Sequence, residues 1–264
     1  MRRFIIRSFA SSIFVACALS GAAHAQDESF LSMGIGLDQS SGTYGTTTTT
    51  DVTSTTVYAL YERGDWWLRL AVPYLQVTGD GSVVVSSGHG GRRSMSGTMT
   101  SATRTTQSGL GDVVAMASYN LVSSEGGGSG LDLAGRIKFG TASGTMGSGK
   151  NDYAAQLTAY SSIGDFSPSL MLGYEVLGSS TDLPLNNIAY GTVGASYAIT
   201  DKTDIGADYR YAQRAAATGS EQREASLYTG IQIGRDTYLR AYVMKGLADG
   251  SPDSSYGLSV SSGF

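Results

Sequence analysis

Polar and apolar residues alternate with a period of two along most of this chain. The final segment shows the pattern clearly, because its larger side chains occupy alternate positions: Tyr256, Leu258, Val260 and the terminal Phe264. A single alternating run is typical of a half-buried β-strand. At least ten earlier segments share this rhythm, and helical periodicity is absent. A whole chain of such segments behind a secretory signal favours a transmembrane β-barrel of the outer-membrane type.

The first 25 residues have the features of that secretory signal. Three arginines precede an apolar stretch over residues 9–19, and residues 23–25 form a small-x-small cleavage site. This order is that of a signal peptide, which is absent from the mature protein. A lipoprotein signal ending at Cys17 is the alternative. We therefore predict a signal peptide over residues 1–25 and a single barrel domain over residues 26–264.

The composition of the predicted mature chain excludes several classes of function. Cleavage removes three of the 18 basic residues and none of the 22 acidic ones, so the net charge becomes 15 − 22 = −7. Nucleic acid is not an expected partner, because binding it needs a basic face. The one cysteine, Cys17, leaves with the signal, which excludes disulfides and thiol chemistry. No apolar run after residue 25 approaches the ~18 residues of a membrane helix.

Twelve strands can be placed between alternating short and long connections. Their predicted ranges are 29–38, 52–63, 66–78, 110–122, 130–140, 152–163, 166–177, 188–199, 203–214, 222–233, 237–247 and 255–264. The five short connections are 64–65, 123–129, 164–165, 201–202 and 234–236, and the six longer ones are 39–51, 79–109, 141–151, 178–187, 215–221 and 248–254. An even antiparallel count with short turns on one side is typical of Gram-negative outer-membrane barrels, and it places both termini in the periplasm.

The two phases of the alternation differ in chemistry. One phase is apolar with aromatic residues toward the strand ends, as in the interfacial girdles of such barrels. The predicted membrane-interface aromatics are Trp66, Tyr74, Tyr153, Tyr174, Tyr256 and Phe264. The other phase is charged, and Arg or Lys facing the middle of the lipid would cost ~2–4 kcal/mol. The predicted lumen-facing residues are Arg69, Asp112, Asp132, Arg136, Lys138, Glu175, Asp208, Arg210, Glu224 and Arg240.

Two alternatives concern these faces. A soluble β-sandwich would explain the alternation, but it would explain neither the paired aromatics nor the terminal phenylalanine. Within a barrel, the mixture of both signs predicts ion pairs across strands. Twelve strands leave an interior wider than a filled eight-stranded barrel and narrower than an open porin. The charged phase is therefore either a polar network that stiffens the wall or a constriction that selects solutes by charge and size.

Two motifs contain residue types used in catalysis or cofactor binding. Residues 144–151 nearly match a phosphate-binding loop, but Asn151 replaces the metal-binding hydroxyl and a strand follows where a helix is required, so we expect a glycine-rich hairpin. His89 is the only histidine after residue 25 and lies between glycines. A triad needs a serine and an orienting carboxylate beside it, and a metal needs clustered ligands. We predict no enzymatic activity, no metal and no cofactor.

The long connection 79–109 contains His89 and three arginines: Arg92, Arg93 and Arg104. Long connections of this kind are often functional or mobile. This one could attract the phosphates of surface lipids, fold into the pore mouth, or form a solvated tip. Residues 83–85, three consecutive valines, could extend the third strand beyond the membrane.

Three segments carry a resemblance to a known family. They are Ser-Gly-Leu-Gly-Asp at 108–112, Gly-Ser-Gly-Lys-Asn-Asp-Tyr at 147–153, and residues 242–253 with the closing strand after them. Together they resemble the outer-membrane barrel family labelled "MetA-pathway of phenol degradation", although residues 140–144 depart from the Pro-Thr-Gly-Asp stretch usual there. The resemblance implies an outer-membrane barrel that moves small aromatic or hydrophobic molecules. It supplies no catalytic residues.

These observations give three hypotheses of function. The first is a passive outer-membrane channel for a small-molecule solute, lined by the charged phase. The second is a structural or adhesive barrel whose interior is filled by the polar network. The third is an outer-membrane hydrolase that uses His89. In each case the expected partners are outer-membrane lipid and lipopolysaccharide, and the barrel-assembly machinery, which would bind the C-terminal strand.

Overall fold

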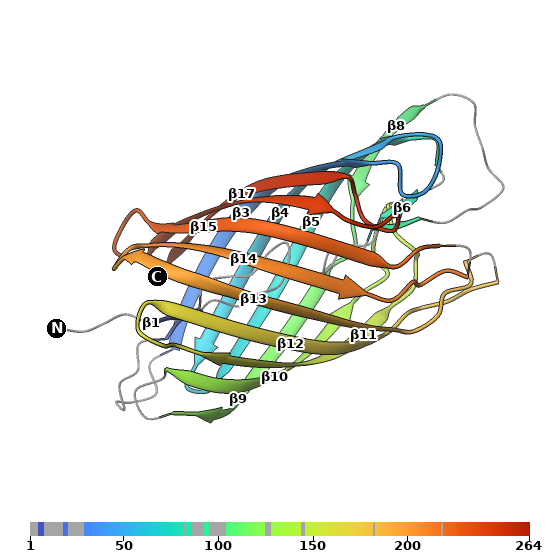
Figure 1. Cartoon of the computed structure of the whole chain (residues 1–264). Coiled ribbons are helices and arrows are strands. Elements are labelled where there is room, and N and C mark those ends of the chain that lie inside the picture. The colour runs from blue at the N-terminus through green and yellow to red at the C-terminus, as the bar shows by residue number, and fades with distance from the viewer. Residues whose placement is uncertain are drawn as a thin grey trace.

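The computed structural model describes residues 5–7, 18–20, 29–81, 83–85, 92–94, 104–124, 128–143, 146–181, 183–217 and 219–264. Within them, one antiparallel sheet of 13 strands curls into a barrel (Figure 1). Its strands are β3 (Ser29–Gly42), β4 (Thr50–Arg63), β5 (Trp66–Gly79), β8 (Thr105–Leu110), β9 (Val114–Ser123), β10 (Ser129–Lys138), β11 (Asp152–Ser161), β12 (Phe166–Val176), β13 (Ile188–Thr200), β14 (Thr203–Ala212), β15 (Gln222–Gln232), β16 (Thr237–Gly246) and β17 (Ser254–Gly263).

The barrel is closed by hydrogen bonds between its first and last strands. β17 pairs with β3 from Ser254↔Ser41 to Gly263↔Ser32, and every other neighbour in the ring is also antiparallel. β8 and β9 share one position, because both pair with β5, one along each half of it. The ring of described strands therefore has 13 − 1 = 12 positions. The predicted 12-stranded antiparallel barrel is confirmed.

The strands differ from the predicted ranges at two places. β3 continues to Gly42 rather than residue 38, which shortens the first long connection. The predicted strand 110–122 starts earlier and is broken at 111–113 into β8 and β9. The break lies opposite Pro73 of β5, which has no N–H to donate to a ladder. Only the Pro73 carbonyl bonds there, accepting from the Gly111 N–H at 2.9 Å.

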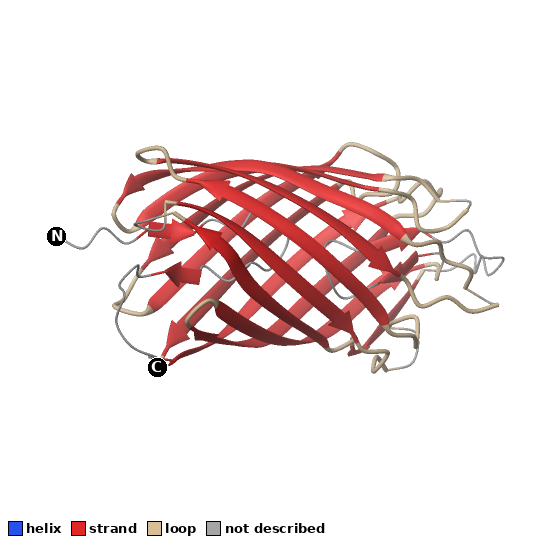
Figure 2. Ribbon diagram, turned by 90° about the horizontal axis from the view of Figure 1, so that it is seen from below, coloured by secondary structure: helices blue, strands red, loops and turns tan. Residues whose placement is uncertain are grey.

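The short connections gather at one end of the barrel with the C-terminus, and the longer ones gather at the other (Figures 1 and 2). Gly64 and Gly164 open two of the short turns with φ angles of 56° and 65°. This left-handed conformation suits glycine, because it has no Cβ, and it matches the twist of a two-residue hairpin.

Two small sheets lie outside the ring of 12. β1 (Ile5–Arg7) pairs with β2 (Ala18–Ser20), and β6 (Val83–Val85) pairs with β7 (Arg92–Ser94). Residues 83–85 therefore form a hairpin of their own and do not extend β5. The predicted cleavage site at residues 23–25 lies outside the described residues. Within the described part of the chain, no helix is long and apolar enough to cross a membrane.

The wall of the barrel has an apolar outer face and a polar inner face. Large apolar side chains alternate along most strands on the exposed side; Leu68 and Leu70, for example, are 49% and 50% exposed. The residues between them are mostly buried, and the buried set is dominated by charged, hydroxyl and small side chains. Because a closed wall has only two sides, this buried phase faces the interior. The apolar face points outward, as a barrel in lipid requires.

Candidate functional site

The ten charged residues predicted to face the lumen all lie in the buried phase of their strands or, for one, at the strand break. Eight are at most 8% exposed: Asp112, Asp132, Arg136, Lys138, Glu175, Asp208, Arg210 and Glu224. Arg69 and Arg240 are half-buried. The six predicted interface aromatics lie in the opposite phase and are 50–79% exposed. By their positions along the strands, Trp66 and Phe264 are at the short-turn end and the other four are nearer the long connections.

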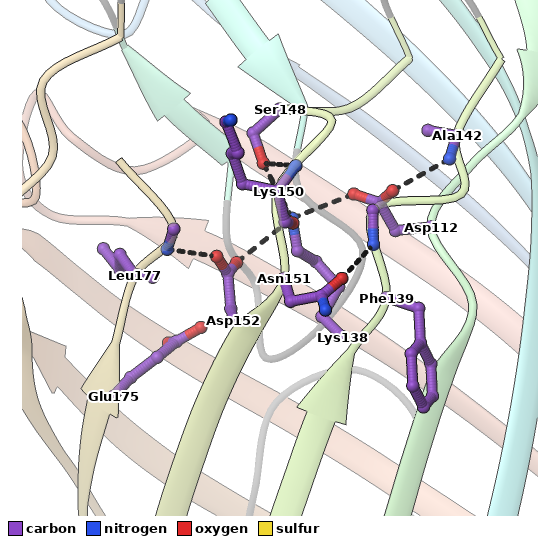
Figure 3. Close-up of polar contacts among 12 residues, drawn as sticks. Asp112, Lys138, Phe139, Ala142, Ser148, Lys150, Asn151, Asp152, Glu175 and Leu177 are labelled. Carbon is purple, nitrogen blue, oxygen red and sulfur yellow. Dashed lines mark hydrogen bonds and ion pairs between the residues drawn. The ribbon is translucent and has the colours of Figure 1, made fainter. Parts of the chain in front are cut away.

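The tightest group of charges surrounds Lys138, the last residue of β10 (Figure 3). Its Nζ atom donates to Asp112 Oδ2 at 2.9 Å and to Ser148 Oγ at 3.0 Å, and lies 3.2 Å from Asp152 Oδ2. The lysine and both aspartates have side chains at most 2% exposed. Removing one member of such a buried group is costly, because it leaves a charge that is neither hydrated nor paired.

The two aspartates also accept hydrogen bonds from the backbone of neighbouring loops. The Ala142 N–H donates to Asp112 Oδ1 at 2.9 Å, and the Gly178 N–H donates to Asp152 Oδ1 at 2.8 Å. Both oxygens of Asp112 thus accept a hydrogen bond, whereas Asp152 accepts one on Oδ1 and faces the Lys138 ammonium group with Oδ2. Satisfying the remaining lone pairs is what makes a buried ion pair tolerable.

This cluster joins two of the sequence motifs that carry the family resemblance. Asp112 ends the motif at 108–112, while Ser148 and Asp152 belong to the motif at 147–153. The two motifs are 35 positions apart in the sequence (147 − 112). Lys138 lies in neither motif and connects them, because its Nζ atom contacts Asp112 of the first and Ser148 of the second. The second motif also approaches Asp112 closely at Gly147. A methyl group on this glycine would lie 2.6 Å from Asp112 Oδ2, too close for any other residue to fit without a shift.

A second buried pair lies deeper on the same strands. Arg136 of β10 and Glu175 of β12 approach to 2.9 Å across the intervening strand β11. Ala154 occupies the β11 position opposite both of them, and its small side chain leaves room for the pair. The hydroxyl of Tyr190, on β13, donates to Gln156 Oε1 at 3.2 Å.

The network continues onto β14 and β15. Arg210 lies 3.9 Å from Glu224, directly opposite it in the ladder, and donates to Gln222 Oε1 at 3.2 Å. Its guanidinium carbon lies 5.7 Å from the centre of the Tyr190 ring. The ion pairs expected from the mixed signs are therefore present. They form a belt across the inner face from the break before β9 to β15.

The remaining predicted residues have other partners. Arg69 and Arg240 stack on tyrosine rings, with guanidinium carbons 4.6 Å from the Tyr58 ring and 4.4 Å from the Tyr228 ring. Asp132 accepts a hydrogen bond of 2.6 Å from the Asn120 side chain.

Inward-facing tyrosines are candidate site residues that the alternation of the sequence does not single out. Five of them lie directly opposite a glycine on the neighbouring strand and cover it so closely that a methyl group on the glycine would overlap the tyrosine side chain. The pairs are Gly34–Tyr58, Gly130–Tyr160, Gly173–Tyr190, Gly206–Tyr228 and Gly257–Tyr242. Three of these tyrosines carry the stacked arginines just described. The interior therefore presents aromatic faces as well as charges.

The candidates for catalysis, metal binding and phosphate binding form no further site among the described residues. His89 lies outside the described residues, so the structure does not place it against a serine or a carboxylate. In the described ranges, no group of three or more His, Cys, Asp or Glu side chains could hold a metal ion. Arg104 pairs with Asp51 at 2.5 Å near the long-connection end. The near-match to a phosphate-binding loop is in part the segment that contributes Ser148 to the Lys138 cluster.

Comparisons with known proteins agree with this architecture. The family model described as the MetA-pathway of phenol degradation matches residues 30–262. An outer membrane channel from Pseudomonas putida F1 is 12% identical with a TM-score of 0.70, and the match covers 93% of this chain and 99% of that one. The translocator domain of the autotransporter NalP from Neisseria meningitidis is 12% identical with a TM-score of 0.52, covering 92% and 90%. At these identities the likeness establishes the fold. No curated protein sequence matches the chain.

Proposed function

The chain belongs to the family described as the MetA-pathway of phenol degradation, and from this premise we propose that it is a passive channel of the Gram-negative outer membrane. Small aromatic solutes cross it down their own concentration gradient, without a cofactor and without a chemical reaction. The observation that carries the proposal is the composition of the two faces: an apolar outer face on a closed wall and an inner face of charges and tyrosine rings.

The chemistry of the inner face supports aromatic solutes that carry a polar or anionic group. Tyrosine rings such as Tyr58 and Tyr228 offer surfaces for stacking, and the stacked guanidinium groups of Arg69 and Arg240 add positive charge beside them. Charged side chains lining a pore filter solutes by electrostatics. We assign this role to the ten inward charged residues, of which Arg69 and Arg240 are the least buried.

The proposal also fixes the orientation and partners of the barrel. Residues 1–25 are a signal peptide that is removed on export. The short turns and both termini of the mature chain face the periplasm, and the long connections face outward, where lipopolysaccharide surrounds them. The six outward aromatics lie at the two lipid interfaces. The barrel-assembly machinery binds the terminal strand β17. The gathering of short turns beside the C-terminus supports this orientation (Figure 1).

Recordings in planar lipid bilayers test the channel. The purified protein should produce discrete conductance steps. Replacing the inward, half-buried Arg240 with Gln removes a positive charge from the lumen, so under a KCl gradient the reversal potential should shift toward the potassium equilibrium potential. Arg235→Gln is the matched control, because this arginine lies in a short turn with a side chain that is 96% exposed. A silent bilayer, or equal shifts for both variants, would contradict the proposal.

A structural barrel with a filled interior is the second candidate. The deep burial of eight inward charges favours it, because a wall network packed this closely stiffens the barrel. It predicts silent bilayers and an outer membrane whose permeability is unchanged when the gene is deleted.

A further inference from the structure

The segment between β10 and β11 has two arms, of which the first continues the barrel wall and the second lies against its inner side. Its first arm takes the place of a strand beside β8: the Phe139 N–H donates to the Val113 carbonyl and the Ser143 N–H donates to the Leu110 carbonyl, both at 2.8 Å. β10 ends at Lys138, so β8 has no strand on this side. The described parts of the segment, 139–143 and 146–151, are called the inner loop below.

The second arm of the inner loop packs against side chains that face the interior. Met146 is 4% exposed and forms an apolar cluster with Val52 of β4 and Leu75 of β5, both in the inward phase. It also covers Gly109 of β8, since a methyl group there would lie 3.4 Å from Met146 Cγ and 3.2 Å from Ser143 Cβ. The inner loop therefore crosses the inner face of β8 and occupies part of the cross-section of the barrel.

The Lys138 cluster fixes this loop at both ends. Lys138 Nζ donates to Ser148 Oγ in the returning arm, and Asp112, its ion-pair partner, accepts from the Ala142 N–H in the first arm. The base is narrow, because Gly140 contacts the Gly149–Lys150 backbone closely. The Val113 N–H also donates to Thr141 Oγ1 at 3.0 Å, and the Gly140 N–H donates to Asn151 Oδ1 at 2.8 Å. Among the contacts of the described part of the loop, those with the Lys138 cluster are the ones that involve buried charges (Figure 3).

We propose that the inner loop is a constriction loop that narrows the lumen near the long-connection end, and that Lys138 is the positioning residue that holds it there. The inference rests on the proposed channel function and adds the element that sets the pore size. Without the ammonium group, Asp112 and Asp152 repel each other and Ser148 loses its donor. The loop then leaves the inner wall and the pore widens.

A cysteine pair tests the position of the loop whether or not the protein conducts. The predicted mature chain has no cysteine, so Gly109→Cys with Ser143→Cys introduces one pair with Cβ atoms near the 3.5–4.5 Å spacing of a disulfide. The pair should form a disulfide in the folded barrel on mild oxidation, seen as a mobility shift that a reductant reverses. A folded protein that does not cross-link would overturn the proposed position.

Conductance then tests the role of Lys138. Lys138→Met should give a larger conductance step than the unsubstituted protein, and Lys150→Met, which changes an exposed lysine of the same loop, should not. In the Lys138→Met protein that also carries the cysteine pair, oxidation should restore the smaller step and reduction should remove it. If the conductance step is the same with and without the disulfide, Lys138 acts only by its charge and the inference is overturned. A silent unsubstituted protein would instead overturn the channel function.

Discussion

At the scale of single residues, the glycine–tyrosine pairs show how aromatic rings come to line the interior. A tyrosine side chain that lies flat on the wall needs a neighbour without a side chain, and glycine is the only residue that provides this. Gly206 and Tyr228 are directly opposite each other, and the ring that covers Gly206 also supports the Arg240 guanidinium at 4.4 Å. Gly206 thus leaves the space that the Tyr228 ring occupies, and the ring in turn contacts the Arg240 guanidinium.

We predict that Gly206→Ala lowers the free energy of unfolding by ~1–3 kcal/mol, because the added methyl group overpacks the Tyr228 ring. Gly135→Ala is the control: this glycine also lies within a strand, but nothing approaches the site of its Cβ within 4 Å. Urea titrations of both variants in lipid vesicles measure the difference. Equal stability of the two proteins would show that the glycine–tyrosine contact carries no energetic weight.

The sequence could predict the facing of the charged residues but not of these tyrosines. Period-two alternation fixes the phase within a strand, and the cost of charge in lipid decides which phase faces inward, as for Arg136 and Lys138. A tyrosine suits either face, so Tyr58, Tyr190 and Tyr228 gave no comparable signal. Their glycine partners depend on the register between strands, which alternation within one strand does not contain.

At the scale of elements, charges link both neighbouring strands and strands separated by a third. Arg136 on β10 and Glu175 on β12 meet at 2.9 Å over Ala154 of β11, so three strands share one ion pair. Arg210 and Glu224 join β14 to β15 in the same belt. Such links add side-chain contacts to the backbone ladder and hold the wall in one shape.

We predict that Arg136→Met lowers the free energy of unfolding by ~3–5 kcal/mol, because it leaves the buried Glu175 carboxylate without its guanidinium. Replacing both residues, as Arg136→Met with Glu175→Leu, should recover most of that loss, since an apolar pair of similar volume needs no compensating charge. Urea titrations of the single and double variants compare the two. A double variant as unstable as the single one would show that the pair is not an energetic unit.

The strand order and most strand ends follow from the alternation and the turn residues, whereas the break between β8 and β9 does not. The causes of the break lie elsewhere in the chain. Pro73 on the neighbouring strand has no backbone N–H for the ladder, and Asp112 forms an ion pair with the buried Lys138. The same limit applies to residues 144–151, for which the sequence predicts only a glycine-rich hairpin. The inward position of Met146 depends on contacts with Leu75 and Val52, more than 60 residues earlier in the chain.

At the scale of the whole molecule, the barrel separates two environments by the alternation of its side chains. The outer face meets lipid with leucine, valine and exposed aromatics, and the inner face collects the charges and the rings. A closed ring of 12 positions leaves no exposed sheet edge along most of its height, and the inner loop covers the edge left by β8. Passage of a solute must then depend on the inner face and the inner loop.

Uptake of radiolabelled benzenesulfonate by proteoliposomes tests the central claim most directly. This anion carries an aromatic ring and a negative charge, and it crosses a bare bilayer slowly because it stays ionised at any working pH. Vesicles with the purified protein should fill much faster than protein-free vesicles and should stop at the external concentration, with or without an imposed proton gradient. Uptake no faster than in protein-free vesicles, or accumulation above the external concentration, would contradict a passive channel for aromatic solutes.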